Sequence, residues 1–317
     1  MLILMGISPA SHSVQALQGT EPATQLVTLS ATESTAGPAH ANRTVFIIAM
    51  ENHDWSAIKN SPSAPYMNQQ LLPIAAYAEQ YFNPPRLHPS EPNYLWLEAG
   101  TNFGILDDAD PVYNHVHSTE HLVTLLDRAG ISWKTYLEGI TGKVCPLVSA
   151  GGYAAKHNPM IFFDDVTDNR DPRSATCIQH MRPYSELAAD LSNNTVSAYN
   201  FITPNECNDM HDSAGCATAD PVRNGDTWLS KEMPKILASP AYQNGGVVFI
   251  VWDEGVPGDG PIGLIAVSPN AKPGYSNSIH YTHSSLLRTA QEIFGVTPLL
   301  GDAANATDLS GLFATFP

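Results

Sequence analysis

The chain has 317 residues, of which 43% are hydrophobic and 9% aromatic, a composition that excludes a mostly disordered protein and suffices for one large domain. Acidic residues outnumber basic ones by 31 to 15, and the formal net charge is −16. This charge disfavours nucleic acid and anionic lipid surfaces as partners, and no run of about 20 apolar residues indicates stable membrane insertion.

The first 42 residues predict a leader rather than part of the fold. The start, MLILMGISPASHSVQA, resembles the tail of a secretory signal peptide, although it is short and lacks basic residues. Residues 17–42 are rich in Thr, Ala, Ser, Gly and Pro, which is typical of flexible segments. We therefore expect a signal remnant and flexible leader over 1–42, a single domain over 43–317, and a secreted or periplasmic protein.

Five short apolar runs, rich in β-branched residues, predict strands that are buried on both faces of a sheet. They span residues 44–50, 131–136, 196–202, 246–252 and 263–268. Strands of this kind, when they alternate with helices, predict an α/β three-layer sandwich with a mostly parallel sheet.

Three helical patterns separate or follow these runs. They cover residues 117–129, a stretch from an N-cap at Asp226 or Thr227 to about 237, and residues 284–294 before Gly295. A further stretch, 141–185, is rich in Pro, Asn and Asp, and is expected to form a long ordered excursion that carries site residues.

The four cysteines predict two disulfides. None has the C-x-x-C spacing of a zinc ribbon or a thioredoxin-like site. Their even number in loop-like sequence indicates a Cys207–Cys216 pair that closes a short loop and a Cys145–Cys177 pair that closes a longer one. Each would contribute about 2–4 kcal/mol if unstrained. The alternative is four free, buried thiols.

Carboxylates directly follow two of the predicted strands. Glu51-Asn52-His53 follows the first run, and Asp253-Glu254 follows the run at 246–252. Ligands of parallel sheets bind at the carboxyl ends of the strands, and an acid there is costly to bury unless it is paired or bound to a cation. Both acid clusters together would form a set of hard oxygen ligands. The alternative is that each acid caps the helix after it.

A serine between two prolines marks a rigid turn. The segment reads His88-Pro-Ser90-Glu-Pro-Asn-Tyr94, and an apolar helical segment follows it. The N-terminus of such a helix stabilises negative charge, which favours Ser90 as a reactive hydroxyl. The alternative is that Ser90 is a plain helix cap.

Six motifs occur in an order that resembles a known family. They are Glu51-Asn-His53, His88-Pro-Ser90-x-Pro-Asn-Tyr94, Lys156-His-Asn-Pro159, Asn200-Phe-Ile-Thr-Pro-Asn-x-Cys-Asn-Asp-Met-His-Asp212, Gly225-Asp-x-Trp228 and Trp252-Asp-Glu254. This order resembles the phosphoesterase family of bacterial acid phosphatases and phospholipases C, within the alkaline phosphatase superfamily. The resemblance spans roughly residues 44–300 and implies an alkaline-phosphatase-like fold, with 43–317 as the catalytic domain.

The resemblance implies a nucleophile and a metal site. Ser90 matches the nucleophile position, and its Ser-x-Pro-Asn setting is also similar to the Thr-x-Pro-Asn turn of nucleotide pyrophosphatases. The implied cofactor is one divalent metal ion (calcium, magnesium, manganese or zinc) whose ligands are Glu51, Asn52, Asp253 and Glu254. Two-metal relatives carry an Asp-x-x-x-His ligand pair, whereas here Cys207 stands four residues before His211, which favours a single ion.

The implied reaction also needs an acid for the leaving alkoxide and donors for the phosphoryl oxygens. The candidate acids are His157, His211 and His283, with His53 and His88 as further candidates. The candidate substrate-binding residues are Asn93, Lys156, Asn158 and His88.

Two other polar groups receive a plainer interpretation. His115, His117 and His121 resemble a metal cluster by spacing alone, and no carboxylate in register orients them, so we expect no metal site there. Asp209 and Asp212 either orient His211 or cap the loop that contains them.

These patterns predict metal-dependent hydrolysis of small phosphoric monoesters, acid-phosphatase-like, through a phosphoserine on Ser90. One alternative is a phospholipase C-type phosphodiesterase. An alternative of another class is a secreted, non-catalytic phosphate- or metal-binding protein. A sulfatase is disfavoured because the sequence lacks a Cys/Ser-x-Pro-x-Arg motif.

Overall fold

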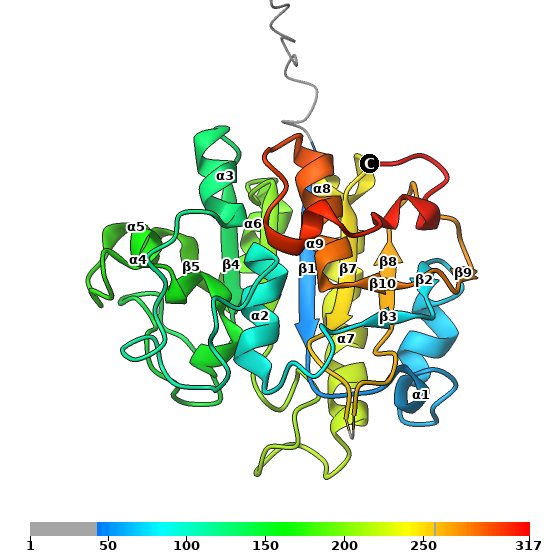
Figure 1. The fold of residues 1–317 in the computed structure, drawn as a ribbon. Helices are drawn as coiled ribbons and strands as arrows, with labels where there is room; N and C mark the ends of the chain where they lie inside the picture. The colour runs from blue at the N-terminus through cyan, green and yellow to red at the C-terminus, as the bar shows by residue number, and fades with distance from the viewer. Residues whose placement is uncertain (1–42, 257) are drawn as a thin grey trace, which may run out of the picture. The chain divides into compact units, whose positions relative to one another are not determined.

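An eight-stranded sheet lies at the centre of the computed structural model, which describes residues 43–256 and 258–317 (Figure 1). The strand order is β5-β4-β6-β1-β7-β8-β2-β9, and the first five strands of that order run parallel. β8 is antiparallel to both of its neighbours. The mostly parallel α/β sheet predicted from the sequence is therefore confirmed. The predicted leader over 1–42 lies outside the described residues.

The strands follow the apolar runs closely. Their bounds are β1 Val45–Met50, β2 Ala76–Ala78, β4 Trp133–Leu137, β5 Met181–Pro183, β6 Tyr199–Thr203, β7 Val247–Trp252, β8 Leu264–Val267 and β9 Tyr275–Asn277. A separate pair joins β3 Tyr81–Phe82 to β10 Tyr281–Thr282. Every residue of β1, β6, β7 and β8 is buried, because these strands lie inside the sheet with both faces covered.

Helices cover both faces of the sheet. Their bounds are α1 Trp55–Ile58, α2 Ser90–Ala99, α3 Leu122–Arg128, α4 Asp164–Thr167, α5 Ala175–His180, α6 Leu187–Asn193, α7 Pro221–Leu237, α8 Pro240–Gln243 and α9 His283–Phe294. Helices α2, α3 and α9 pack against one another in front of the sheet in Figure 1, and α6 and α7 lie behind it. The described residues thus form the three predicted layers.

Two predicted helix starts are wrong. The helix expected to have its N-cap at Asp226 or Thr227 has its N-cap at Asp220 and begins at Pro221. The Asp220 carboxylate accepts a hydrogen bond from the backbone of Arg223. Asp226 is an interior residue instead. The helix expected from residue 117 begins at Leu122, because the chain before it is extended.

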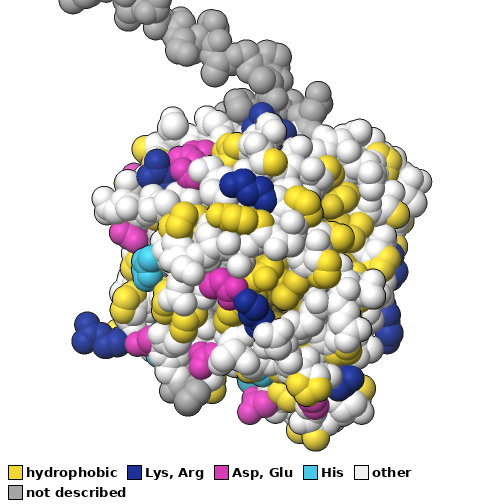
Figure 2. Space-filling model, turned by 90° about the vertical axis from the view of Figure 1, so that its right-hand side faces the viewer, with side chains coloured by type: hydrophobic (Ala, Val, Ile, Leu, Met, Phe, Trp, Pro, Cys, Tyr) yellow, Lys and Arg dark blue, Asp and Glu magenta, His cyan; other side chains and the backbone are white. Residues whose placement is uncertain are grey.

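Both predicted disulfides are present, Cys145–Cys177 and Cys207–Cys216, with Cα atoms 5.4 and 5.2 Å apart. Among the described residues, no helix is both long enough and apolar enough to cross a membrane. Charged side chains are scattered over the surface, as Figure 2 shows for the face that lies to the right in Figure 1.

Candidate active site

The ends of two neighbouring strands bring the first acids together. β1 and β7 pair in parallel with Met50 opposite Trp252, so the residues that follow each strand leave the sheet at the same level. Glu51 and Asp253 are both fully buried there. The backbone N–H of Asn52 donates a hydrogen bond of 2.9 Å to Asp253 Oδ1. The adjacency of these two acids therefore follows directly from the strand register.

Ser90 reaches this pair from the front layer. It is the first residue of α2 and is 1% exposed. Its hydroxyl donates a hydrogen bond of 3.2 Å to Glu51 Oε2. The dipole of α2 points its positive end toward that hydroxyl. The structure therefore brings the predicted nucleophile and the predicted metal ligands into contact.

Two further side chains contact Glu51. Tyr94 lies one turn after Ser90 on α2, and its hydroxyl donates to Glu51 Oε1 at 2.6 Å. The His157 ring stacks on Tyr94 with a centroid separation of 5.1 Å, and its Nε2 is 3.2 Å from Glu51 Oε1. Burial and the neighbouring Lys156 charge lower the pKa of His157, so its imidazole is neutral at pH 7.

Asp209 and His211 complete the buried wall of the site. Asp209 Oδ2 is 3.4 Å from His157 Nδ1, and its backbone carbonyl accepts from the N–H of Glu51 at 2.7 Å. Asp209 Oδ1 accepts from the backbone N–H of His211 at 2.8 Å. Ligand atoms of Glu51, His157 and His211 all lie within 4.8 Å of one another, a spacing that suits a shared metal ion.

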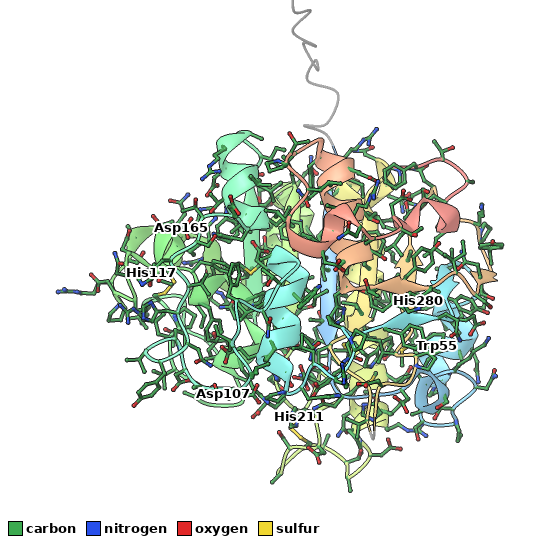
Figure 3. The ribbon with its side chains drawn as sticks, viewed as in Figure 1. Trp55, Asp107, His117, Asp165, His211 and His280 are labelled. Carbon is green, nitrogen blue, oxygen red and sulfur yellow. A yellow bond between two sulfur atoms is a disulfide. The ribbon has the colours of Figure 1, made fainter. Side chains whose placement is uncertain are left out.

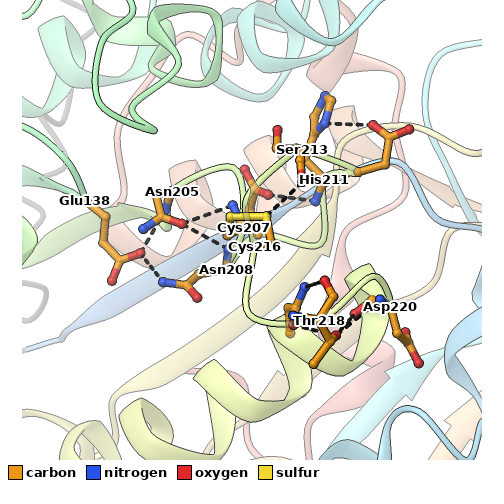
Figure 4. The surroundings of a disulfide bond; sticks show 12 residues. Glu138, Asn205, Cys207, Asn208, His211, Ser213, Cys216, Thr218 and Asp220 are labelled. Atoms are coloured by element: carbon orange, nitrogen blue, oxygen red, sulfur yellow. Dashed lines mark hydrogen bonds and ion pairs between the residues drawn. A yellow bond between two sulfur atoms is a disulfide. The ribbon is translucent and has the colours of Figure 1, made fainter.

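A disulfide loop presents His211 (Figure 4). The side-chain oxygen of Asn205 accepts hydrogen bonds from the backbone N–H groups of Cys207 and Asn208. Cys207 and Cys216 then close the loop around His211. A cavity of about 330 Å³ borders His211 and this loop. The loop therefore fixes one histidine of the site, with this cavity on the side of the loop.

Helix α7 supports the same segment from behind. A Cβ atom at Gly225 would lie 2.3 Å from Cγ of Met210, so only glycine permits this approach. Met210 has a φ of 81°, a rare conformation for a bulky residue, and stands between Asp209 and His211. The carboxylate of Asp226 accepts from the backbone N–H of Met67 at 2.8 Å. The Gly225-Asp motif thus acts as scaffolding for the site.

Several buried polar atoms of the site lack a hydrogen-bond partner among the described residues. They are Asn52 Oδ1, Asn93 Oδ1, Asp209 Oδ2 and Asp253 Oδ2. Burial, with the nearby Asp253 charge, raises the pKa of Glu51, and burial raises the pKa of Asp253 to about 6. Buried oxygens without donors, on acids that repel one another, are the chemistry of a cation site.

Glu254 is held on the outer side of this group. Its Oε2 accepts from Asn93 Nδ2 at 3.1 Å and lies 2.6 Å from His88 Nδ1. Burial and the adjacent Asp253 charge raise the pKa of Glu254 to about 7. Although burial opposes it, the charges of Glu254 and Asp259 raise the pKa of His88. His88 and Asn93 therefore contact Glu254 directly.

Lys156 places a positive charge at the edge of the acid cluster. Its Nζ donates to Asp108 Oδ2 at 3.0 Å, while Asp108 Oδ1 accepts from the backbone N–H of Glu91. Burial disfavours the charged amine, but the Asp108 and Glu51 carboxylates outweigh it and raise the pKa of Lys156. The amine is thus charged and close to the nucleophile helix.

Three other predicted residues have side chains engaged elsewhere. His283 is fully buried, with Nε2 2.6 Å from the backbone oxygen of Asp253 and Nδ1 3.1 Å from the Tyr81 hydroxyl. Asn158 donates to the Tyr153 hydroxyl at 3.2 Å. His53 Nδ1 lies 2.8 Å from the backbone oxygen of Glu51. These contacts give the three side chains supporting positions around the site.

Most of the sequence matches a family model. The model of the phosphoesterase family aligns with residues 62–297, which include Ser90, His157, His211 and Asp253. The chain belongs to the phosphoesterase family.

Named relatives agree with this assignment. This phosphoesterase is 29% identical over 274 residues to the phosphatidylinositol-3-phosphatase of Mycobacterium tuberculosis, covering 85% of the chain and 82% of the relative. It is 29% identical over 288 residues to a probable acid phosphatase of Kluyveromyces lactis (84% and 64%). It spans 51% of the phosphate-repressible acid phosphatase of Penicillium chrysogenum. The chain is therefore a phosphoric ester hydrolase.

Solved structures show the same fold. Murine ectonucleotide pyrophosphatase/phosphodiesterase 5 superposes with a TM-score of 0.56 at 10% identity, covering 86% of this phosphoesterase and all of that chain. A Vibrio parahaemolyticus protein of the alkaline phosphatase superfamily superposes with a TM-score of 0.52 at 10% identity, covering 81% and 68%. The alkaline-phosphatase-like fold expected from the motifs is confirmed.

The sequence did not predict the roles of two residues of the site. Tyr94 stands four residues after Ser90, so it had to share the Ser90 face of α2, and that spacing was a usable signal. Asp209 was interpreted as a support of His211 or a loop cap, but it also closes the acid cluster beneath Glu51. Its place depends on the path of a loop, which local sequence does not specify.

Proposed function

We propose that the chain hydrolyses small phosphoric monoesters in a metal-dependent reaction with Ser90 as nucleophile. The observation that carries this proposal is the 3.2 Å contact between the Ser90 hydroxyl and Glu51, beside buried acid oxygens that have no donor. A helix N-terminus, a reactive hydroxyl and a cation site then coincide at one point.

The residues present fit a divalent cation. Glu51, Asn52 and Asp253 would hold it through oxygen, and the neutral imidazole of His157 lies close enough to Glu51 to add nitrogen. Glu254 would support the set from its position beside His88 and Asn93. When bound, such an ion lowers the pKa of a coordinated hydroxyl and offsets charge on phosphoryl oxygens.

The chain's own residues supply the remaining functions. Glu51 orients the Ser90 oxygen for in-line attack on phosphorus and accepts its hydroxyl proton along their hydrogen bond. A phosphoserine forms as the bond from phosphorus to the ester oxygen breaks. The α2 N-terminus and Lys156 stabilise charge on the phosphoryl oxygens. His211 borders the cavity and would protonate the leaving alkoxide, after which water hydrolyses the phosphoserine. His283 acts as a positioning residue beneath Asp253.

Burial and the nearby Lys156 charge lower the pKa of His211. Its charged form therefore becomes abundant only below the ordinary histidine range of about 6.5. Because only the charged imidazolium of His211 can protonate the leaving group, turnover should be favoured at acidic pH. This agrees with the names of the fungal relatives.

The monoester preference rests on the relatives, which are named phosphatases. A phospholipase C-type phosphodiesterase is the second candidate, because the ectonucleotide phosphodiesterase shares the fold. We also place the protein in an oxidising compartment outside the cytoplasm, since two disulfides persist there.

The test compares Ser90→Ala with Ser192→Ala, a control at an exposed serine on α6. Each protein is assayed with para-nitrophenyl phosphate, bis-para-nitrophenyl phosphate and para-nitrophenyl phosphorylcholine, with and without chelator. We expect monoester turnover that chelator abolishes, that Ser192→Ala retains and that Ser90→Ala loses. Acid quenching with peptide mass analysis should trap phosphate on Ser90.

Other outcomes would redirect the proposal. Activity of Ser90→Ala within tenfold of the parent would move the nucleophile elsewhere. Faster turnover of the diesters would favour the phosphodiesterase, and no turnover of any ester by a metal-loaded protein would favour the non-catalytic binding protein.

A further inference from the structure

A second group of metal-ligating side chains lies apart from the proposed active site. His115 and His117 belong to the segment between α2 and α3, and Asp164 is the first residue of α4. Figure 3 labels His117 on the left of the molecule and His211 at the bottom. The three residues share no contact with Ser90, Glu51 or Asp253 among the interactions of the described residues.

Backbone pairing fixes the two histidines. Val116, between them, donates to the carbonyl of Phe162 at 2.8 Å, and its own carbonyl accepts from the N–H of Asp164 at 2.9 Å. Side chains alternate along an extended segment, so the buried Val116 points inward while His115 and His117 point together toward Asp164. The cluster is therefore held by the main chain before any ligand arrives.

The ligand atoms already have a spacing suited to coordination. His115 Nδ1 is 3.0 Å from Asp164 Oδ2, and His117 Nδ1 contacts the same oxygen. All three atoms lie within 4.8 Å of one another, and the two rings are almost perpendicular at 88°. Nitrogen and oxygen ligands about 2.1 Å from a tetrahedral zinc ion are separated by about 3.4 Å. Small movements would therefore suffice to surround an ion.

Hydrogen bonding within the cluster leaves polar atoms unsatisfied. Asp164 Oδ1 is buried and has no hydrogen-bond partner among the described residues. Arg170 Nε forms an ion pair with it at 3.5 Å, a distance too long for a good hydrogen bond, and this nitrogen has no hydrogen-bond partner among the described residues. The Asp164 side chain is 8% exposed, whereas the His117 side chain is 77% exposed and open to solvent. The buried oxygen can approach an ion from the protein side while water approaches from outside.

We propose that His115, His117 and Asp164 bind a divalent transition-metal ion of the zinc type, with water as the remaining ligand. Two imidazole nitrogens and one carboxylate suit zinc, whereas calcium and magnesium require mostly oxygen ligands. The absence of a carboxylate in register, inferred from the sequence, is thus corrected: Asp164 comes from 47 residues after His117 in the chain.

The ion would clamp a segment that also supports the nucleophile helix. The segment that carries His115 and His117 carries Asp108, which bonds the backbone N–H of Glu91 and the amine of Lys156. Bound zinc would therefore stabilise this segment against α4 without contacting substrate. Loss of this ion should therefore lower protein stability and metal content but should not change the rate of ester hydrolysis.

The experiment counts zinc ions in the full-length chain. Metal-free protein is dialysed against buffered free zinc, and bound zinc is measured by elemental analysis for the parent, His115→Ala/His117→Ala and His280→Ala. His280 is an exposed histidine on the opposite side of the molecule in Figure 3. We expect the double variant to bind one zinc ion fewer than the parent and His280→Ala. Calcium should not substitute for the missing ion.

Two readouts separate this site from the catalytic one. The exposed His117→Ala single variant, which leaves the buried residues intact, should weaken one class of zinc sites more than about tenfold. Monoester turnover at saturating metal should stay within about twofold of the parent in both variants. Equal zinc content and affinity in parent, single and double variants would overturn the proposal.

Discussion

Helix α2 has a buried cluster of acids and histidines at each end, and the two clusters behave in opposite ways. At its start, Ser90 and Tyr94 contact Glu51, beside His157. At its end, Glu98 contacts His121. Both clusters consist of the same residue types, so composition alone does not explain the difference between them; Glu51, Asp209 and Asp253 are fully buried, whereas Asp165 of the second cluster is exposed.

The cluster at the end of α2 pairs each acid with His121, although burial raises the pKa of Glu98 and leaves its Oε2 without a hydrogen-bond partner among the described residues. Glu98 Oε1 accepts from the backbone N–H of Val123 at 2.8 Å and lies 3.0 Å from His121 Nδ1. The other ring nitrogen of His121 is 3.1 Å from Asp165, whose second oxygen accepts from Thr124. Although burial opposes both effects, the carboxylates raise the pKa of His121, and His121 lowers the pKa of Asp165. These contacts fasten α2 to α3 and α4.

The cluster at the start of α2 does not neutralise itself. Glu51, Asp209 and Asp253 face a histidine, His157, whose pKa burial lowers, so no imidazolium balances them. The charged Lys156 at the edge of the cluster donates to Asp108 instead. The lesson is that a buried acid cluster is structural when cations inside the chain satisfy it, and is a ligand site when they do not. The predictions below test this contrast.

The largest expected effect is on catalysis. Asp253→Asn removes a charged oxygen from the cation site, and we expect kcat to fall by about 1,000-fold or more, because charge stabilisation by a metal is worth several kcal/mol. The matched change at the other end of α2, Asp165→Asn, should leave kcat within about threefold. Steady-state assays with para-nitrophenyl phosphate check both, and equal losses would remove the distinction between the clusters.

The next effect is on folding. His121→Ala leaves Glu98 buried without its cation, and we expect the free energy of unfolding to fall by about 3–5 kcal/mol in urea titrations. The loss of unfolding free energy relative to the parent should be largest below pH 6.5. It should become smaller as the pH rises through the raised pKa of His121, because the parent then loses the stabilising charge of that imidazolium. The exposed His280→Ala should change stability by less than about 0.5 kcal/mol. A parent-like unfolding curve for His121→Ala would contradict the structural role.

A smaller effect is expected at His211. If it protonates the leaving group, His211→Ala should lower kcat about 100-fold for an alkyl phosphate such as glycerol phosphate. The loss should be less than about tenfold for para-nitrophenyl phosphate, whose phenolate leaves without a proton. Equal losses for both esters would indicate that His211 serves the cation site instead.

The smallest effect concerns pH and the metal-free chain. Burial raises the pKa of Asp253 to about 6, so between pH 4 and 6 the folded chain binds more protons than the unfolded one. Stability from this group therefore falls as pH rises through that range. Without metal, we expect the melting temperature to drop by a few degrees between pH 5 and 7, and to recover on addition of a divalent ion. A chain that melts identically with and without metal at pH 7 would count against the cation site.

Much of the fold was predictable because the signal was local. The runs at Val45–Met50 and Val247–Trp252 are apolar without alternation, which only a strand buried on both faces requires. Short strands such as Met181–Pro183 carry no such signal, because their pairing depends on neighbours far away in the chain. The antiparallel direction of Leu264–Val267 is likewise set by its connections.

Some residues of the site could likewise be predicted from local sequence and others could not. Ser90, Glu51 and Asp253 lie at the ends of a helix and two strands whose ends are evident in the sequence, so their proximity could be predicted. The local sequence around His283 does not distinguish a catalytic residue from a positioning residue. Its contact with the backbone of Asp253 depends on how α9 packs against the sheet. The partner of His115 and His117 was hidden because Asp164 reaches them through an isolated backbone bridge.

The pairing of Met50 with Trp252 has a consequence for how such a protein can change. One residue inserted into either strand would move an acid by about 3.3 Å and turn its side chain to the opposite face. The disulfide loop holds Asp209 and His211, whereas strand register alone holds Glu51 and Asp253. The geometry of this acid pair therefore depends on the number of residues in each strand as well as on their chemistry.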